Sequence, residues 1–112
     1  MKNKVILVTT DQFGKGDAEL GKVVMENFFT LLKQREELPH AIFFMNHGVN
    51  LLTESSLVSV HLKELAEKDV SLLACKTCVD FYKIEQKMTT GVISGMSDFV
   101  ELASQYEIIT IA

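Results

Sequence analysis

Apolar runs and helical stripes alternate along this chain. Five short runs are apolar at nearly every position and are bounded by polar or glycine-containing stretches, a pattern typical of buried strands. They cover residues 4–8, 41–45, 70–74, 91–94 and 107–111. Because these runs are continuous rather than alternating, they predict parallel strands that are covered on both faces of a sheet.

Between the strands, apolar residues recur at the spacing of an amphipathic helix. Asp17 is expected to cap the first helix and Thr53 the second, and a short helix is expected over residues 79–87. The stripes predicted to face the sheet are Leu20, Val23, Val24, Phe28, Leu31 and Leu32 in the first helix, Val58, Leu62, Leu65 and Ala66 in the second, and Met96, Phe99, Val100 and Ala103 in the last.

This alternation predicts one α/β domain over residues 1–112, a three-layer α/β/α sandwich around a mostly parallel sheet of about five strands. In such sheets ligands and chemistry gather beyond the carboxyl ends of the strands. Four distinctive loops each follow a predicted strand: TTDQFGKGD, NHGVN, CKTC and SGM. We therefore expect a functional site along the edge that these loops share.

Composition narrows the classes of protein that fit. With 112 residues of which 47% are apolar, the chain can build a core without disulfides or a structural metal. A net charge of −4 and the absence of any basic run argue against a nucleic-acid partner. The apolar stretches are too short to span a membrane, and the first residues lack a signal-peptide cleavage site. These features predict a cytoplasmic protein with no membrane partner.

The only two cysteines, Cys75 and Cys78, stand at the end of the third predicted strand. In a reducing compartment such a pair is more often reactive or metal-binding than structural. The N-terminus of a following helix favours a thiolate, and Lys76 adds a nearby cation. A thiolate on Cys75 would attack a sulfane-sulfur donor and hold the sulfur as a persulfide, and Cys78 would assist or close a disulfide.

Disulfide exchange, zinc binding and simple packing are three alternative roles for the pair. Thioredoxin-type exchange normally needs a proline facing the motif, whereas the only proline, Pro39, precedes the second strand. Zinc needs at least three protein ligands, and the histidines show no ligand spacing, so we expect no metal site. His47 alone lies on the predicted active edge, where a zinc site with the cysteines would need further ligands from another subunit. Either cysteine can also serve simply as a small buried side chain.

The neighbouring loops contain the residues of a possible pocket around the thiols. Gly14 and Gly16 precede a helix and can turn backbone N–H groups toward an anion, but they lack the spacing of a dinucleotide or phosphate loop, and we identify no cofactor. Gly48 is expected to adopt a positive φ. The other candidates are Asn46, as a hydrogen-bonding group, His47, as a proton shuttle, and Lys76 and Thr77 between the cysteines.

Four segments, TTDQFGKGDAELGKVVMENFF, FFMNHGVNLLTESS, LLACKTCVDFY and TTGVISGMSDFVE, resemble in order and spacing the DsrE-like family of small sulfur-relay proteins. The resemblance is strongest to the C-terminal domain of YedF-like selenium-metabolism proteins. It implies a flavodoxin-like parallel sheet and a homo-oligomer, often built from trimers. By register it places the family's sulfur-carrying cysteine on Cys75, while Cys78 matches a second cysteine that only some branches have.

The chain also departs from that pattern. Lys76 stands where the family often has glycine, and Gly95-Met96-Ser97 stands where YedF-like domains commonly read NMY. The companion TusA-like domain, which has its own cysteine, is not part of this sequence.

The sequence thus supports two hypotheses. The first is a sulfur carrier or sulfurtransferase-like protein with a separate sulfur donor or acceptor protein, and the second is a non-catalytic oligomeric module that binds a partner protein or a small anion.

Overall fold

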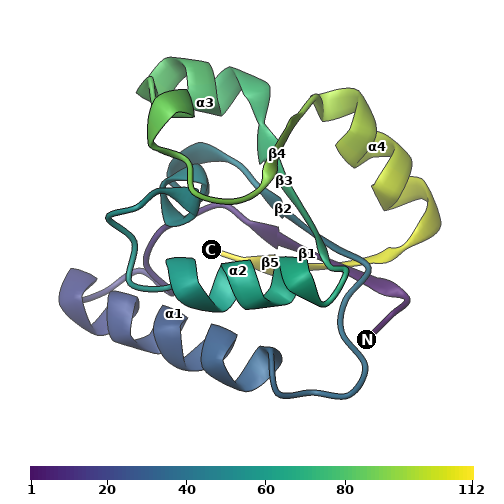
Figure 1. Cartoon of the computed structure of the whole chain (residues 1–112), viewed down its shortest axis with the longest axis horizontal. Coiled ribbons are helices and arrows are strands. Elements are labelled where there is room, and N and C mark those ends of the chain that lie inside the picture. Colours follow the sequence, from purple (N-terminus) through teal and green to yellow (C-terminus); the bar gives the residue numbers. More distant parts are fainter.

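A computed structural model describes residues 1–112 and contains a sheet of five parallel strands (Figure 1). The strands are β1 (Lys4–Val8), β2 (Ala41–Phe44), β3 (Ser71–Cys75), β4 (Val92–Ser94) and β5 (Glu107–Ile111), in the spatial order β4-β3-β2-β1-β5. The helices are α1 (Ala18–Leu32), α2 (Ser59–Glu67), α3 (Lys76–Tyr82) and α4 (Met96–Gln105), with two short 3-10 helices, η1 (Asn46–Leu52) and η2 (Glu85–Lys87). The predicted α/β class and the five strands are confirmed.

The helices cover both faces of the sheet. Successive side chains of a strand point to opposite faces, so β2 contributes to both layers. Ile42 and Phe44 pack in the main core with α1 and α2, whereas the ring of Phe43 lies 5.1 Å from that of Phe99 in α4. Figure 1 shows α1 and α2 side by side and α4 apart from them, across the strands. The predicted three-layer sandwich is therefore confirmed.

The strand order places the thiols near one edge of the sheet. From β1 to β4 each strand is added beside the previous one, and the chain then crosses to the opposite edge to form β5 next to β1. The architecture is of the flavodoxin-like kind, although flavodoxin itself has the strand order 2-1-3-4-5. Because all neighbouring strands are parallel, the four loops that follow β1 to β4 share the carboxyl edge, as predicted.

Helix α1 is rotated relative to the predicted stripe. Its buried residues are Gly21, Met25, Phe29 and Leu32, and most of the predicted stripe is exposed: Leu20, Val23, Val24 and Leu31. The close packing of Gly21 explains the difference, because a Cβ there would lie 2.9 Å from the Cβ of Gln12. Only glycine lets the loop after β1 approach the helix this closely, so this contact selects the face that turns inward.

The helix ends confirm one predicted cap and correct several predicted helix boundaries. Asp17 caps α1 as predicted, and its Oδ1 accepts a hydrogen bond from the Leu20 N–H at 3.0 Å. Thr53 does not cap the N-terminus of α2, which begins only at Ser59; it is instead the C-cap residue of η1 and forms a β-bridge with Met88. Helix α3 starts at Lys76 rather than at residue 79. Half of the residues in the two remaining predicted stripes, those of α2 and α4, are buried or half-buried as predicted: Val58, Leu62, Leu65 and Phe99. The other half are exposed: Ala66, Met96, Val100 and Ala103. No helix is long and apolar enough to cross a membrane.

Candidate functional site

Cys75 stands at the junction between strand and helix. It is the last residue of β3 and the cap residue of α3, which confirms its predicted place at the carboxyl edge of the sheet. Its side chain is covered, however, with only 4% of the residue exposed. In the single chain, the Cys75 side chain is therefore surrounded by neighbouring residues and has almost no contact with solvent.

Cys78 is the more accessible thiol of the pair. It is half-buried in the first turn of α3, and its Sγ accepts a hydrogen bond from the backbone N–H of Asn46 at 3.1 Å. Asn46 adopts the left-handed backbone conformation, with φ of 53°, where η1 begins after β2. The loop after β2 thus contacts the thiol that follows β3, and both cysteines are free.

The surroundings of Cys78 favour its protonated form. Burial raises the pKa of the Cys78 thiol, the Asn46 N–H opposes that effect, and the hydrogen bond and negative charge of neighbouring Cys75 raise the pKa further. A thiol with a raised pKa stays protonated at neutral pH. Within this pair, the Cys78 thiol is therefore suited to donate a hydrogen bond.

This assignment predicts slow alkylation of Cys78. Because the thiolate reacts and the thiol does not, the rate at Cys78 should inflect at a higher pH than that of an ordinary exposed thiol. In Cys75→Ser the inflection should move down, because the neighbouring thiolate is gone, while burial keeps it raised. Peptide-resolved mass spectrometry of iodoacetamide labelling across pH measures both. An inflection below that of an ordinary thiol in the wild type would contradict the assignment.

The two residues between the cysteines face solvent. The Lys76 ammonium group lies 2.9 Å from Asp80 Oδ2, one turn further along α3, and this hydrogen bond is the main cause of the raised pKa of Lys76. The cation expected to support a thiolate is thus engaged by a carboxylate on the outer face of the helix. Thr77 is exposed beside it.

Gly48 has a different role from the one predicted. Its φ is not positive, and the left-handed residue in this loop is Asn46 instead. A Cβ at Gly48 would lie 2.3 Å from the carbonyl oxygen of Val8, so the glycine is needed for close packing of η1 against the end of β1. This packing determines where the Asn46 N–H stands relative to Cys78.

The remaining predicted residues, His47, Gly14 and Gly16, differ in their position relative to α3. His47 is exposed, and its ring lies 5.0 Å from that of Tyr82 at the end of α3. Gly14 and Gly16 follow β1, two strands away from β3. Gly14 has a φ of 88° and donates its N–H to the carbonyl oxygen of Ala112 at 3.0 Å, so that amide is not free for an anion.

The structure adds two residues that the sequence did not indicate, Ser94 and Asp98. Ser94 ends β4 and is the register partner of Cys75 in the parallel pair β3–β4. In-register neighbours point to the same face of a sheet, on strands about 4.8 Å apart. The buried Ser94 hydroxyl donates to Asp98 Oδ2 at 2.6 Å, so a polar group held by a carboxylate lies next to the Cys75 side chain. In the sequence, the only feature that indicates them is the SGM loop, which begins at Ser94 and is followed closely by Asp98.

Taken together, these features define a class of protein: a parallel α/β domain with two free thiols, one helical turn apart, at the carboxyl edge of its sheet. No third metal-binding side chain stands beside the pair. The chain belongs to the DsrE/DsrF-like family, whose model matches residues 2–111. The resemblance inferred from the sequence is therefore confirmed at the level of the family.

Solved structures show the same fold. A protein of unknown function from Methanobacterium thermoautotrophicum, MTH1491, superposes with a TM-score of 0.68 at 20% identity, covering 96% of each chain. The ychN protein from E. coli gives 0.69 at 16% identity, covering 97% of this chain and 99% of that one. BT1422 from Bacteroides thetaiotaomicron, also of unknown function, gives 0.67 at 15% identity, covering 97% and 95%. No curated protein sequence matches the chain.

Proposed function

We propose that this protein is a small sulfur carrier that holds a persulfide on Cys75, with Cys78 as its assisting thiol. Membership of the DsrE/DsrF-like family supports a sulfur-relay-like role in general. The observation that carries the specific proposal is the pair of free, mutually interacting thiols where β3 meets α3. We also propose that it works in the cytoplasm, where thiols stay reduced, and that YedF-like domains are its nearest functional counterparts.

The proposed transfer needs no oxidant. The Cys75 thiolate attacks the outer sulfur of a persulfide donor, the S–S bond of the donor breaks, and the donor leaves as a thiolate. Cys75 then carries the extra sulfur, and the thiol proton of Cys78 can hydrogen-bond to the persulfide anion. An acceptor thiolate removes the outer sulfur by the same exchange. Alternatively, Cys78 attacks the inner sulfur, which forms a Cys75–Cys78 disulfide and releases hydrosulfide.

A direct test is the intact mass of the protein after incubation with glutathione persulfide, measured without reductant. The proposal expects each chain to gain the mass of one sulfur atom, and the gain should disappear on treatment with dithiothreitol. A protein that neither gains sulfur nor forms a Cys75–Cys78 disulfide, under conditions that load a small free thiol, would refute the carrier role.

The burial of Cys75 favours a second candidate function. A nearly covered sulfur atom also fits a non-catalytic module in which both cysteines pack and a surface binds the partner. In that case the chain takes up no sulfur, and replacing both cysteines with serine leaves its assembly unchanged. The sulfur-uptake measurement therefore distinguishes the two functions.

We propose in addition that the chain self-associates through the side of the molecule around β4. Four large apolar side chains are exposed on α3, β4 and α4: Phe81, Val92, Met96 and Val100. Figure 1 shows β4 between these two helices. Clustered exposed apolar side chains are typical of an interface. Because β4 is also the neighbour of β3, this surface adjoins the strand that ends at Cys75.

Light scattering tests the self-association. We expect a mass that is a multiple of the chain mass, and Phe81→Glu, with 76% of Phe81 exposed, should shift it toward one chain. Leu31→Glu on α1 places the same charge on another well-exposed apolar residue away from this surface and should leave the mass unchanged. A wild-type monomer, or a response to Leu31→Glu alone, would contradict the proposed interface.

A further inference from the structure

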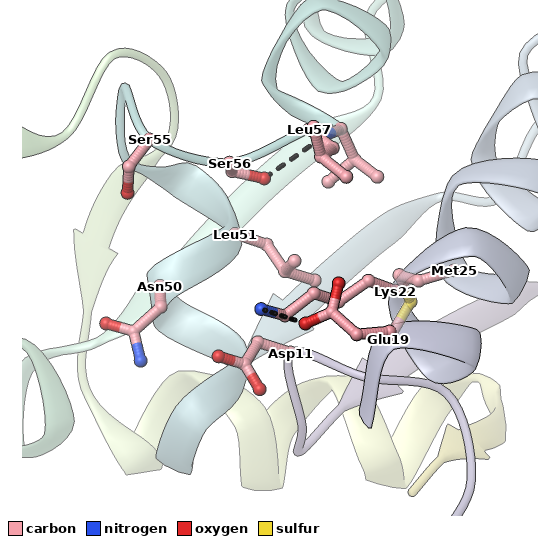
Figure 2. Close-up of a pocket in the computed structure, with 10 residues that line it drawn as sticks. Asp11, Glu19, Lys22, Met25, Asn50, Leu51, Ser55, Ser56 and Leu57 are labelled. Carbon is pink, nitrogen blue, oxygen red and sulfur yellow. Dashed lines mark hydrogen bonds and ion pairs between the residues drawn. The ribbon is translucent and has the colours of Figure 1, made fainter. Parts of the chain in front are cut away.

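A second site lies apart from the thiols, in a cavity between α1, η1 and the segment 55–58 (Figure 2). Its volume is about 360 Å³, which lies within the range of small-molecule pockets in proteins. None of the residues assigned to the sulfur site lines it. It also lies at the carboxyl edge of the sheet, because Asp11 follows β1 and Asn50 follows β2.

One wall of the cavity carries a net negative charge. Asp11, Glu19 and Lys22 meet there, and the Lys22 ammonium group lies 3.8 Å from Glu19 Oε1. Figure 2 shows the Asp11 carboxylate facing the same space with no hydrogen bond or ion pair to the residues drawn. Two carboxylates and one ammonium group leave one negative charge uncompensated, and Asp11 is the unpaired group.

The rest of the cavity combines free polar groups with an apolar floor. Ser56 Oγ accepts a hydrogen bond from the Val58 N–H at 3.1 Å, so its own proton and a second lone pair remain available to a ligand. Asn50 also lines the cavity, and its side-chain amide offers both a donor and an acceptor. Figure 2 shows Leu51 between Ser56 and Asp11, where it provides aliphatic surface, and Leu57 beside Ser56.

We propose that this cavity binds a small aliphatic amine. Its ammonium group pairs with Asp11, its carbon chain lies against Leu51 and Leu57, and a second polar end reaches Asn50 and Ser56. A dicarboxylate or phosphate fits less well, because it would face Asp11 and Glu19 with a single ammonium group that Glu19 already engages. The inference does not depend on the sulfur chemistry, since no cysteine lines the cavity.

The test titrates the isotope-labelled full chain with putrescine, a four-carbon diamine, and follows amide shifts by NMR at moderate ionic strength. We expect saturable binding at one site, with shifts at Asp11, Asn50 and Ser56. Asp11→Asn should weaken binding roughly tenfold or more, because it removes a charge-assisted hydrogen bond. Glu36→Gln removes one negative charge from an exposed position outside the cavity and should leave the affinity unchanged.

Two further ligands and one further variant make the result decisive. The neutral 1,4-butanediol and the anionic succinate, each with the same four-carbon length, should bind more weakly than putrescine. Preferential binding of succinate, shifts without saturation, or equal losses in Asp11→Asn and Glu36→Gln would each overturn the proposal. A variant with both cysteines replaced by serine should bind putrescine like the wild type, so this inference and the sulfur-carrier function can fail separately.

Discussion

Replacing Cys75 with serine should abolish the uptake of sulfur from a persulfide donor, whereas Cys78→Ser should keep the uptake and slow the release of the bound sulfur. In the proposed chemistry Cys75 supplies the attacking thiolate, and a serine hydroxyl at neutral pH cannot replace it. Cys78 is needed only to support the persulfide or to displace hydrosulfide from it. The Cys78→Ser chain should therefore retain its extra sulfur longer and form no intramolecular disulfide.

Three measurements make this comparison interpretable. Intact mass after donor treatment gives the sulfur content, and a hydrosulfide assay gives the release from the loaded protein. Thermal unfolding monitors the fold, because Cys75 is buried and Cys75→Ser places a hydroxyl in its position. Sulfur uptake by Cys75→Ser equal to that of the wild type, in a variant that remains folded, would show that Cys75 is not the carrier.

Gly48→Ala should destabilise the protein by roughly 2–4 kcal/mol, the range of severe overpacking. The added Cβ would lie 2.3 Å from the Val8 carbonyl oxygen and 3.0 Å from its carbon. Both are backbone atoms of β1, so no change of side-chain rotamer can relieve the contact. The end of β1 or the whole of η1 must move, and η1 carries the Asn46 N–H that contacts Cys78.

Gly16→Ala is the matched control for that substitution. A Cβ at Gly16 has no atom within 4 Å, and its backbone is not in the left-handed region, so its effect should stay within about 0.5 kcal/mol. Urea unfolding of the two variants beside the wild type measures both free energies of unfolding. Equal stabilities for Gly48→Ala and Gly16→Ala would contradict the close packing of η1 on β1.

The strands and the place of the cysteines could be predicted because local features determine them. A parallel strand buried on both faces requires a continuous apolar run, and few other elements of this length produce one. Once the third run is recognised as a strand, CKTC must fall at its carboxyl end. The capping role of Asp17 is equally local, since it depends on a side chain and an N–H three residues apart.

Several other features depend on contacts between distant residues. Helix α1 carries apolar side chains on two faces, and the contact of Gly21 with Gln12 decides which face turns inward. Similarly, the packing of Gly48 on Val8 is invisible in the sequence, where a glycine after a strand indicates a positive φ. The partnership of Ser94 with Cys75 arises only from the register of β3 and β4.

The second cavity could not be predicted for the same reason. Asp11, Lys22, Asn50 and Ser56 belong to four different segments of the chain, and no short motif connects them. Each residue alone has an ordinary role on a loop or a helix surface. Only the folding of η1 and the following loop against α1 gives these groups a common space, so a sequence pattern could indicate the edge of the sheet but not this site.

In the proposed function, Cys75 carries the sulfur. Peptide-resolved mass spectrometry of the wild-type protein, after treatment with glutathione persulfide and blocking of free thiols, tests it most directly. Because Lys76 lies between Cys75 and Cys78, trypsin releases the two cysteines on separate peptides, and the peptide mass assigns the added sulfur to one of them. The account predicts the extra sulfur atom on Cys75. A protein with neither added sulfur nor a Cys75–Cys78 disulfide, or with sulfur on Cys78 alone, would contradict this expectation.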